Sequence, residues 1–210
     1  MEIEDIIKKV KNHTPTIIGM NRLVKFAVLL PFMRINDEVH LLFEVRAKKL
    51  KRQPGEICFP GGKVEPTDHD AKHTAIRETS EELGISADMI QHVYPLDYVM
   101  TAYGTVVYPF VGMIDPDASL EPNKDEVGEV FTVPFQFFLE TKPEIYEVHF
   151  RAEPEENFPY ESIIGGKKYK WNSPKIEEHF YYYKDKVIWG LTARMIYYFI
   201  DMLKSEPSLK

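Results

Sequence analysis

The sequence predicts a single mixed α/β domain that extends over residues 1–210. Predicted strands and helices are mixed along the chain, and we find no internal repeat. Hydrophobic residues make up 44% and aromatic residues 13% of the 210 positions, which supports one sizeable core. These observations indicate an α/β fold with a helix near each end of the chain.

The chain begins with a predicted amphipathic helix within residues 1–15. Four apolar residues follow the spacing i, i+3, i+4, i+7, namely Ile3, Ile6, Ile7 and Val10. The segment from His13 to Pro15 ends this helix.

The core of the domain is expected from about residue 25 to 203. It opens with strands at Phe26 to Met33 and Val39 to Val45, which an Asn36-Asp37 turn joins into a hairpin.

The rest of the core is predicted to alternate between strands and helices. Extended segments are expected at Val93 to Met100, Thr105 to Ile114 and Tyr146 to Phe150. Helices are expected at Val133 to Leu139 and Trp189 to Leu203, and the aromatic residues of the latter are expected in the core or in a dimer surface. Prolines and a Gly-Gly pair indicate loops and short strands from Ala152 to Lys175.

The most informative segment, residues 61–85, places a glycine turn ahead of a short acidic helix. The helix carries four charged residues, Arg77, Glu78, Glu81 and Glu82. An α-helix turns by about 100° per residue, so Glu78 and Glu82 share one face and Glu81 lies on the neighbouring stripe. An apolar side made by Ile76, Thr79 and Leu83 would pack on the core and leave the acidic face open to a cleft.

This arrangement predicts a metal site for cleaving phosphate anhydrides. Oxygen-rich clusters suit hard divalent cations such as Mg²⁺, and Arg77 can hold Glu81 one turn away by a charge-assisted hydrogen bond. Asp68 and Asp70 are candidate N-caps of the helix, and Gly84 is a candidate left-handed residue at its end. Gly61 and Gly62 would let the chain turn tightly and bring a backbone carbonyl close to the metals. A solvated acidic helix face is the alternative interpretation.

The same segment resembles the Nudix box, G-x5-E-x7-R-E-U-x-E-E-x-G-U, where U is a bulky aliphatic residue. The matching positions are Arg77, Glu78, Glu81, Glu82, Gly84 and Ile85. Asp68 stands where the first Glu of the box is expected, Thr79 fills an aliphatic position, and one extra residue separates Gly62 from Arg77. The resemblance implies the α/β/α Nudix sandwich with a mixed sheet.

The extra residue and the flanking sequence resemble the coenzyme A diphosphatase branch of the Nudix hydrolases. Its upstream motif, L-L-T-x-R-[SA]-x3-R-x3-G-x3-F-P-G-G, is matched in spacing from Leu42 to Gly62, with Glu44 in place of Thr and Lys51 in place of the second Arg. Downstream, residues 126–134 resemble E-V-x-x-V-F-x-V-P and residues 188–193 resemble I-W-G-x-T-A. The resemblance covers about residues 25 to 203.

This resemblance implies metal-dependent hydrolysis of coenzyme A or acyl-coenzyme A to 3′,5′-ADP and 4′-phosphopantetheine or its acyl form. The implied cofactor is Mg²⁺ or Mn²⁺, as two or three ions held by Glu78, Glu81, Glu82 and the Gly61 carbonyl. Arg77 is assigned to the catalytic group, and the general base stays open between Glu81 and Glu126. Two alternatives remain: a Nudix hydrolase for ADP-ribose, dinucleoside polyphosphates or other nucleoside diphosphate derivatives, and a binding or regulatory module without catalysis.

Residues 46–52 place five cations in seven positions of an otherwise acidic chain. This basic segment could attract a polyanionic substrate and contact a phosphate remote from the one attacked, such as the 3′-phosphate of coenzyme A. Among its residues we favour Arg46, Lys51 and Arg52, with the others in a solubilising loop. The motif resemblance adds Gly55, Phe59 and Gly62 to the expected substrate-binding residues.

Among the remaining candidates, the two histidines and the cysteine are not expected to have a functional role, whereas Glu126 is a candidate through the resemblance. His69 and His73 lie four residues apart, but no third ligand is near in sequence, so a solvent-facing pair is expected. Cys58, the only cysteine, is expected to be a small buried residue. By composition alone Glu126 and Glu129 are surface residues, and only the resemblance makes Glu126 a candidate metal ligand or base.

Composition also limits the partners. A formal charge of −7 and an isoelectric point near 5.6 argue against general nucleic-acid binding. No apolar run approaches the roughly 18 residues that span a bilayer, and the N-terminus has no apolar segment typical of a secretory signal. We therefore expect a cytoplasmic protein that binds a small nucleotide-type molecule, without a membrane partner. A homodimer through the terminal helices is a further hypothesis.

Overall fold

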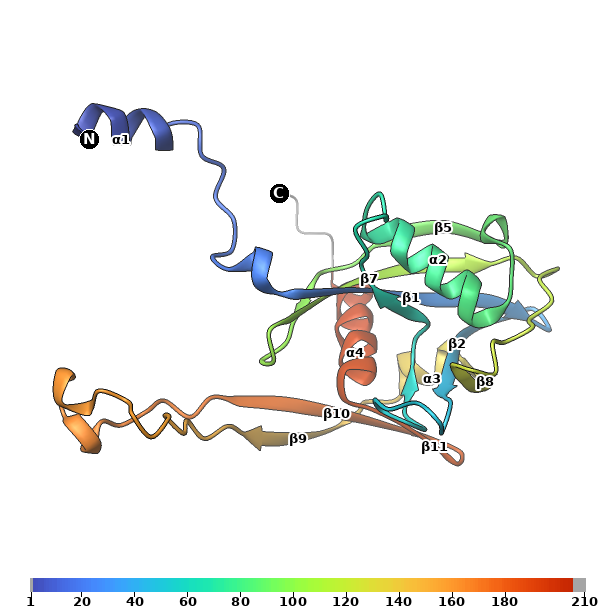
Figure 1. Ribbon diagram of the computed structural model, residues 1–210. Helices are drawn as coiled ribbons and strands as arrows, with labels where there is room; N and C mark the ends of the chain where they lie inside the picture. Colours follow the sequence, from blue (N-terminus) through green and yellow to red (C-terminus); the bar gives the residue numbers. More distant parts are fainter. Residues whose placement is uncertain (1, 206–210) are drawn as a thin grey trace.

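The computed structural model describes residues 2–205, and an eight-stranded mixed sheet lies at its centre (Figure 1). The main order is β3-β2-β1-β7-β5, with β4 beside β1, β6 beside β7 and β8 beside β2. Only β1 and β7 pair in parallel within this sheet. The strands are β1 (Val24–Ile35), β2 (Glu38–Arg46), β3 (Ile57–Cys58), β4 (Gly61–Lys63), β5 (Ile90–Pro95), β6 (Val99–Met100), β7 (Thr105–Ile114) and β8 (Val127–Pro134).

Helices cover both faces of this sheet, which confirms the predicted α/β/α arrangement. Helix α2 (Ala71–Leu83) packs on one face, and α3 (Phe135–Glu140) and α4 (Gly190–Lys204) pack on the other. Side chains alternate between the two faces along a strand. In β1, Leu29 accordingly joins the core under α2, whereas Leu30 joins the core under α4.

The predicted hairpin is confirmed, and its turn has a local cause. β1 and β2 pair from Phe32 with Leu41 to Ile35 with Glu38, which leaves Asn36 and Asp37 as a two-residue loop. Both have positive φ values, 48° and 65°. Such loops favour Asn and Asp, which tolerate the left-handed region better than most residues.

Two predicted boundaries were wrong. The helix expected at Val133 begins only at Phe135, because Val133 and Pro134 belong to β8 and pair with β2. The strand expected at Val93 to Met100 is divided into β5, which ends at Pro95, and β6, which begins at Val99; both pair with β7. In both cases pairing with a distant strand decides the boundary.

The chain also has two projections from the sandwich (Figure 1). Helix α1 (Ile3–Val10) forms as predicted but buries none of its residues. A three-stranded sheet contains β9 (Glu144–His149), β10 (Lys175–Tyr183) and β11 (Lys186–Trp189), and β10 packs against α4.

Short helical turns complete the chain. Loops and short strands were expected between β9 and β10; the segment consists of loops with the 3-10 turns η3 (Tyr160–Ser162) and η4 (Gly166–Lys168). Two others are η1 (Met20–Arg22) and η2 (Ala87–Met89). The predicted domain also includes residues 1 and 206–210, which lie outside the described residues.

Candidate active site

Helix α2 begins and ends as its sequence predicts. Asp70 is the N-cap, and its Oδ1 accepts a hydrogen bond from the His73 backbone N–H at 2.8 Å. Gly84 closes the helix in the left-handed region at φ 64°. A Cβ at this position would lie 2.0 Å from the Glu121 carbonyl oxygen, so the chain needs glycine there for space as well as conformation.

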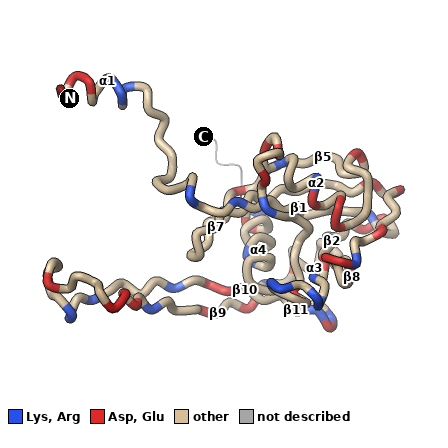
Figure 2. Tube along the Cα trace, viewed as in Figure 1, with Lys and Arg blue, Asp and Glu red and all other residues tan. Residues whose placement is uncertain are grey.

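The acidic side of α2, which was predicted to be open to a cleft, lies partly against the Gly61-Gly62 turn. Acidic positions along α2 are visible in Figure 2. Glu82 is only 4% exposed, and its Oε2 accepts a hydrogen bond from the Gly61 N–H at 2.8 Å. Glu78 is partly buried, and a Cβ on Gly62 would lie 2.2 Å from its carboxyl carbon. Glu81 is exposed. The turn therefore holds the backbone directly beside two carboxylates.

Arg77 links the loop before α2 to this carboxylate cluster. Its Nε and Nη2 donate to the two oxygens of Asp68 at 3.0 and 3.1 Å. The same guanidinium lies 2.9 Å from Glu78 and 3.2 Å from Glu81, so the predicted Arg77–Glu81 contact is present. The Asp68 side chain is 1% exposed, and hydrogen bonding to Arg77 lowers its pKa. Asp68 thus fixes the arginine that orients two glutamates.

Burial and like charges disfavour ionisation of the inner carboxylates. Burial raises the pKa of Glu82 to about 9, and the nearby charges of Glu44, Glu78 and Glu126 act in the same direction. Burial also raises the pKa of Glu78, although Arg77 partly opposes this shift. A divalent cation would relieve the repulsion and favour the ionised carboxylates.

Glu44 is a buried carboxylate near this cluster that was not predicted from the sequence. It lies on β2, is 1% exposed, and accepts a hydrogen bond on Oε1 from the Cys58 thiol at 3.2 Å. Burial raises the pKa of Glu44 to about 7. The sequence contained one feature that could have indicated this residue: Glu44 is a charged residue within an apolar strand segment, at a position where the related motif has Thr. Cys58, which was expected to be buried, is only partly so.

The metal-free chain is expected to lose stability as pH rises from about 5 to about 9. Between the ordinary carboxyl pKa of 4.5 and the raised values of Glu44 and Glu82, the folded chain binds more protons than the unfolded chain. The free energy of unfolding therefore falls with increasing pH in this window, and below it both states are protonated. Thermal unfolding in a chelator at several pH values measures this. Glu82→Gln should flatten the decline, and an unchanged slope in that variant would contradict our account.

Glu126 approaches the cluster from the loop before β8. Its carbonyl accepts a hydrogen bond from the Ala47 N–H at 2.8 Å, and the neighbouring Asp125 forms an ion pair with Lys49. The charge of Glu126 contributes to the raised pKa of Glu78 and Glu82. Glu129 instead pairs with Lys186 at 2.7 Å. The Asn123 N–H donates to the Glu82 carbonyl at 2.9 Å, so the loop that carries Glu126 also lies against the end of α2.

The expected substrate-binding residues lie in three different environments. Lys51 and Arg52 are exposed and form no ion pair within residues 2–205. The Arg46 Nε is buried without a hydrogen-bond partner among the described residues, and Gly55 closes the loop in a left-handed conformation at φ 77°. Phe59 is 2% exposed and stacks on Phe43. The Phe59 side chain is therefore part of the core, and its role in substrate binding stays a prediction.

The oxygen donors beside the glycine turn fit a divalent cation chemically. Within residues 2–205, no three His, Cys, Asp or Glu side chains form a ready-made metal cage. Mg²⁺ commonly uses only one or two carboxylates together with water and substrate phosphates, so a cage is not required. The Gly61 carbonyl stays a predicted ligand. His69 is exposed and His73 contacts Asp68 at 3.0 Å, as expected of a solvent-facing pair.

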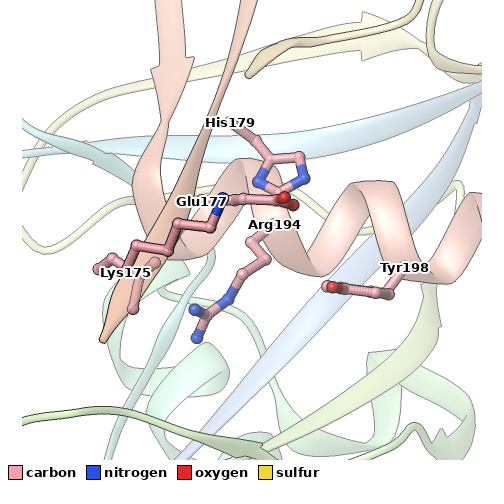
Figure 3. Close-up of a pocket in the computed structure, with 6 residues that line it drawn as sticks. Lys175, Glu177, His179, Arg194 and Tyr198 are labelled. Carbon is pink, nitrogen blue, oxygen red and sulfur yellow. The ribbon is translucent and has the colours of Figure 1, made fainter. Parts of the chain in front are cut away.

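A separate hollow of about 250 Å³ lies between β10 and α4 (Figure 3). Its lining includes Arg194, Glu177 and the fully buried His179, whose two ring nitrogens have no hydrogen-bond partner among the described residues. None of the predicted site residues lines it.

No helix within residues 2–205 has the length and apolar character needed to cross a bilayer.

Comparison with known proteins places the chain among relatives with named activities. It is 43% identical over 125 residues to peroxisomal coenzyme A diphosphatase NUDT7 of Mus musculus, covering 58% of this chain and 51% of the relative. It is 40% identical over 129 residues to mitochondrial coenzyme A diphosphatase NUDT8 of Homo sapiens, covering 59% and 53%. The chain thus spans about half the length of these two relatives.

One relative matches most of the chain, and one family model matches more than half of it. The chain is 31% identical over 172 residues to the uncharacterized Nudix hydrolase NudL of Photorhabdus laumondii, covering 81% of this chain and 80% of the relative. The family described as the NUDIX domain matches residues 26–158, more than half of the chain and including the turn and all of α2. The chain therefore belongs to the Nudix domain family.

Proposed function

We propose that the chain hydrolyses the pyrophosphate bond of coenzyme A or acyl-coenzyme A. The products are 3′,5′-ADP and 4′-phosphopantetheine or its acyl form. The observation that carries this proposal is the buried Glu82 beside Glu78 at the Gly61-Gly62 turn, because it concentrates hard oxygen donors where backbone can approach closely. The names of the two coenzyme A diphosphatase relatives support the choice of substrate.

The proposed cofactor is a divalent cation, Mg²⁺ or Mn²⁺, held by Glu78, Glu82 and the more exposed Glu81, with the Gly61 carbonyl. When bound, it would neutralise phosphate charge and favour the deprotonation of water. Arg77 keeps Glu78 and Glu81 oriented through its ion pairs, while Asp68 holds Arg77. Water attacks one phosphorus, and the bond from that phosphorus to the bridging oxygen breaks as the other phosphate leaves.

We favour Glu126 over Glu81 as the general base. The Glu81 carboxylate already accepts a hydrogen bond from Arg77 at 3.2 Å. Glu126 forms no ion pair within residues 2–205 and lies on a loop that approaches Glu78 and Glu82. It can therefore accept a proton from the attacking water while the helix carboxylates hold the cation.

The basic segment supports recognition of a second phosphate. Lys51 and Arg52 are exposed on the loop that closes between Arg46 and Gly55. We infer that this loop contacts the 3′-phosphate of coenzyme A, since a phosphate remote from the pyrophosphate can bind free cations without taking part in the reaction. The loop is tied to the Glu126 loop by the Lys49–Asp125 ion pair and the Ala47 hydrogen bond.

Hydrolysis of coenzyme A in the presence of Mg²⁺ or Mn²⁺ tests the proposal. The panel includes acyl-coenzyme A, dephospho-coenzyme A, ADP-ribose, a diadenosine polyphosphate and nucleoside triphosphates, with products separated by chromatography. We expect release of 3′,5′-ADP from coenzyme A and a higher KM for dephospho-coenzyme A, which lacks the 3′-phosphate. Preference for ADP-ribose or a dinucleotide would reject the substrate but keep the metal chemistry. Inactivity on every compound would favour a binding module.

The remaining sequence predictions concern assembly and location. Light scattering of the full chain tests the predicted homodimer through the terminal helices, where α1 and α4 both expose apolar residues. Imaging of the tagged full-length protein in its own cells tests the predicted cytoplasmic location. The printed names of the two animal relatives are peroxisomal and mitochondrial, so these compartments are the alternative outcomes.

A further inference from the structure

Glu44 has a buried oxygen that nothing in the described residues satisfies. Its Oε1 accepts a hydrogen bond from Cys58, but Oε2 is buried without a hydrogen-bond partner. Leaving a buried polar group without a hydrogen-bond partner destabilises the folded state, and more so when the group is charged. A buried polar atom without a hydrogen-bond partner is unusual in a native fold, and a bound ion is one explanation for it.

The position of Glu44 on the sheet directs it towards α2. Side chains alternate along β2, so Glu44 shares a face with Leu42, which belongs to the core beneath α2, and Phe43 belongs to the opposite core. β3 pairs Cys58 with Glu44, and three residues later Gly61 donates its N–H to Glu82. Glu44 and Glu82, the two most buried glutamates among residues 2–205, therefore lie in one region.

We propose that Glu44 is an additional carboxylate of the metal centre, and that its free oxygen binds the divalent cation held by Glu82. This inference rests on the proposed function, because that function requires a cation at the glycine turn. It adds a ligand from β2 to a centre otherwise built from α2 and its preceding turn. Cys58 then has a positioning role, since its thiol hydrogen bond fixes Oε1 and leaves Oε2 for the cation.

A purely structural role and a metal-binding role for Glu44 predict opposite effects of its replacement on the stability of the metal-free protein. If the carboxylate only supports the fold through Cys58, its replacement should weaken the metal-free protein. If Glu44 serves a cation, the metal-free protein bears an unpaired buried carboxylate beside Glu82, and a neutral residue should leave its stability unchanged or higher. Stability with and without metal therefore separates the two roles.

The experiment measures Mn²⁺ binding to the full chain after chelator treatment, by calorimetry and by electron paramagnetic resonance. The variants are Glu44→Gln, which keeps the shape and removes the charge, and Glu44→Thr, which introduces the residue of the related motif. Glu140→Gln is the matched control, because Glu140 is an exposed glutamate of α3 on the other face of the sheet. Thermal unfolding is recorded for each protein with and without Mn²⁺.

We expect both Glu44 variants to bind Mn²⁺ more weakly by a factor on the order of 10, with a smaller increase in Tm on adding Mn²⁺. The control should match wild type. Wild-type Mn²⁺ affinity in both variants would overturn the proposal, and so would unfolding of both in metal-free buffer. Coenzyme A cleavage by the wild type is scored separately. Glu44-dependent Mn²⁺ binding without cleavage rejects only the proposed function, whereas cleavage with unaltered Mn²⁺ binding in the variants rejects only the role of Glu44.

Discussion

Glu82→Gln is expected to reduce hydrolysis of the pyrophosphate substrate by at least about 10³-fold, because loss of a metal-holding carboxylate removes several kcal/mol of transition-state stabilisation. The fold should remain, since the amide oxygen of Gln can still accept the hydrogen bond from the Gly61 N–H. Removing the charge also relieves repulsion between Glu82 and Glu44. Steady-state kinetics at saturating Mg²⁺, with circular dichroism and Tm as folding checks, provide the measurement.

Two companion variants make this result specific. Glu126→Gln should lose more activity than Glu81→Gln if Glu126 is the base, and its pH–rate profile should lose the limb that corresponds to the base. A larger loss in Glu81→Gln would reverse that assignment. Near-normal turnover by Glu82→Gln would reject the whole site, because no other glutamate of α2 is as deeply buried beside the glycine turn.

Gly62→Ala should reduce activity on the order of 10²-fold with a small effect on stability, as expected when a catalytic group is displaced by about 1 Å. The new methyl group would lie 2.2 Å from the carboxyl carbon of Glu78 and 2.3 Å from its Oε1. Both atoms are at the end of a flexible side chain, so Glu78 can move away without opening the core. The measurement is kcat together with Tm for the variant and wild type.

Other glycines provide matched comparisons for this variant. Gly128→Ala places its methyl group no closer than 3.4 Å to any neighbour, so activity and Tm should stay near wild type. In Gly61→Ala, the new methyl group would lie 2.3 Å from the backbone oxygen of Ala27. This variant should therefore have a lower Tm as well as lower activity. Full activity in Gly62→Ala would show that the position of Glu78 beside the turn is unimportant for turnover.

The sequence by itself determined the features that depend on neighbouring residues. The Asn36-Asp37 turn, the Asp70 cap, the Gly84 end of α2 and the Arg77–Glu81 contact each follow from residues within about one helical turn. The mixed α/β class followed from the pattern of apolar residues, because the same spacing that forms an element also gives it a face to bury.

Only the tertiary structure decided how the carboxylates differ. Glu81 and Glu82 are adjacent in sequence, yet one is exposed and the other buried, because the Gly61 turn packs over Glu82. Glu44 joins them through the pairing of β2 with β3, and Glu126 approaches through contacts between two loops. Strand register and loop packing depend on residues far apart along the chain. Local periodicity therefore predicted an acidic helix, while long-range packing determined which glutamates are buried beside one another.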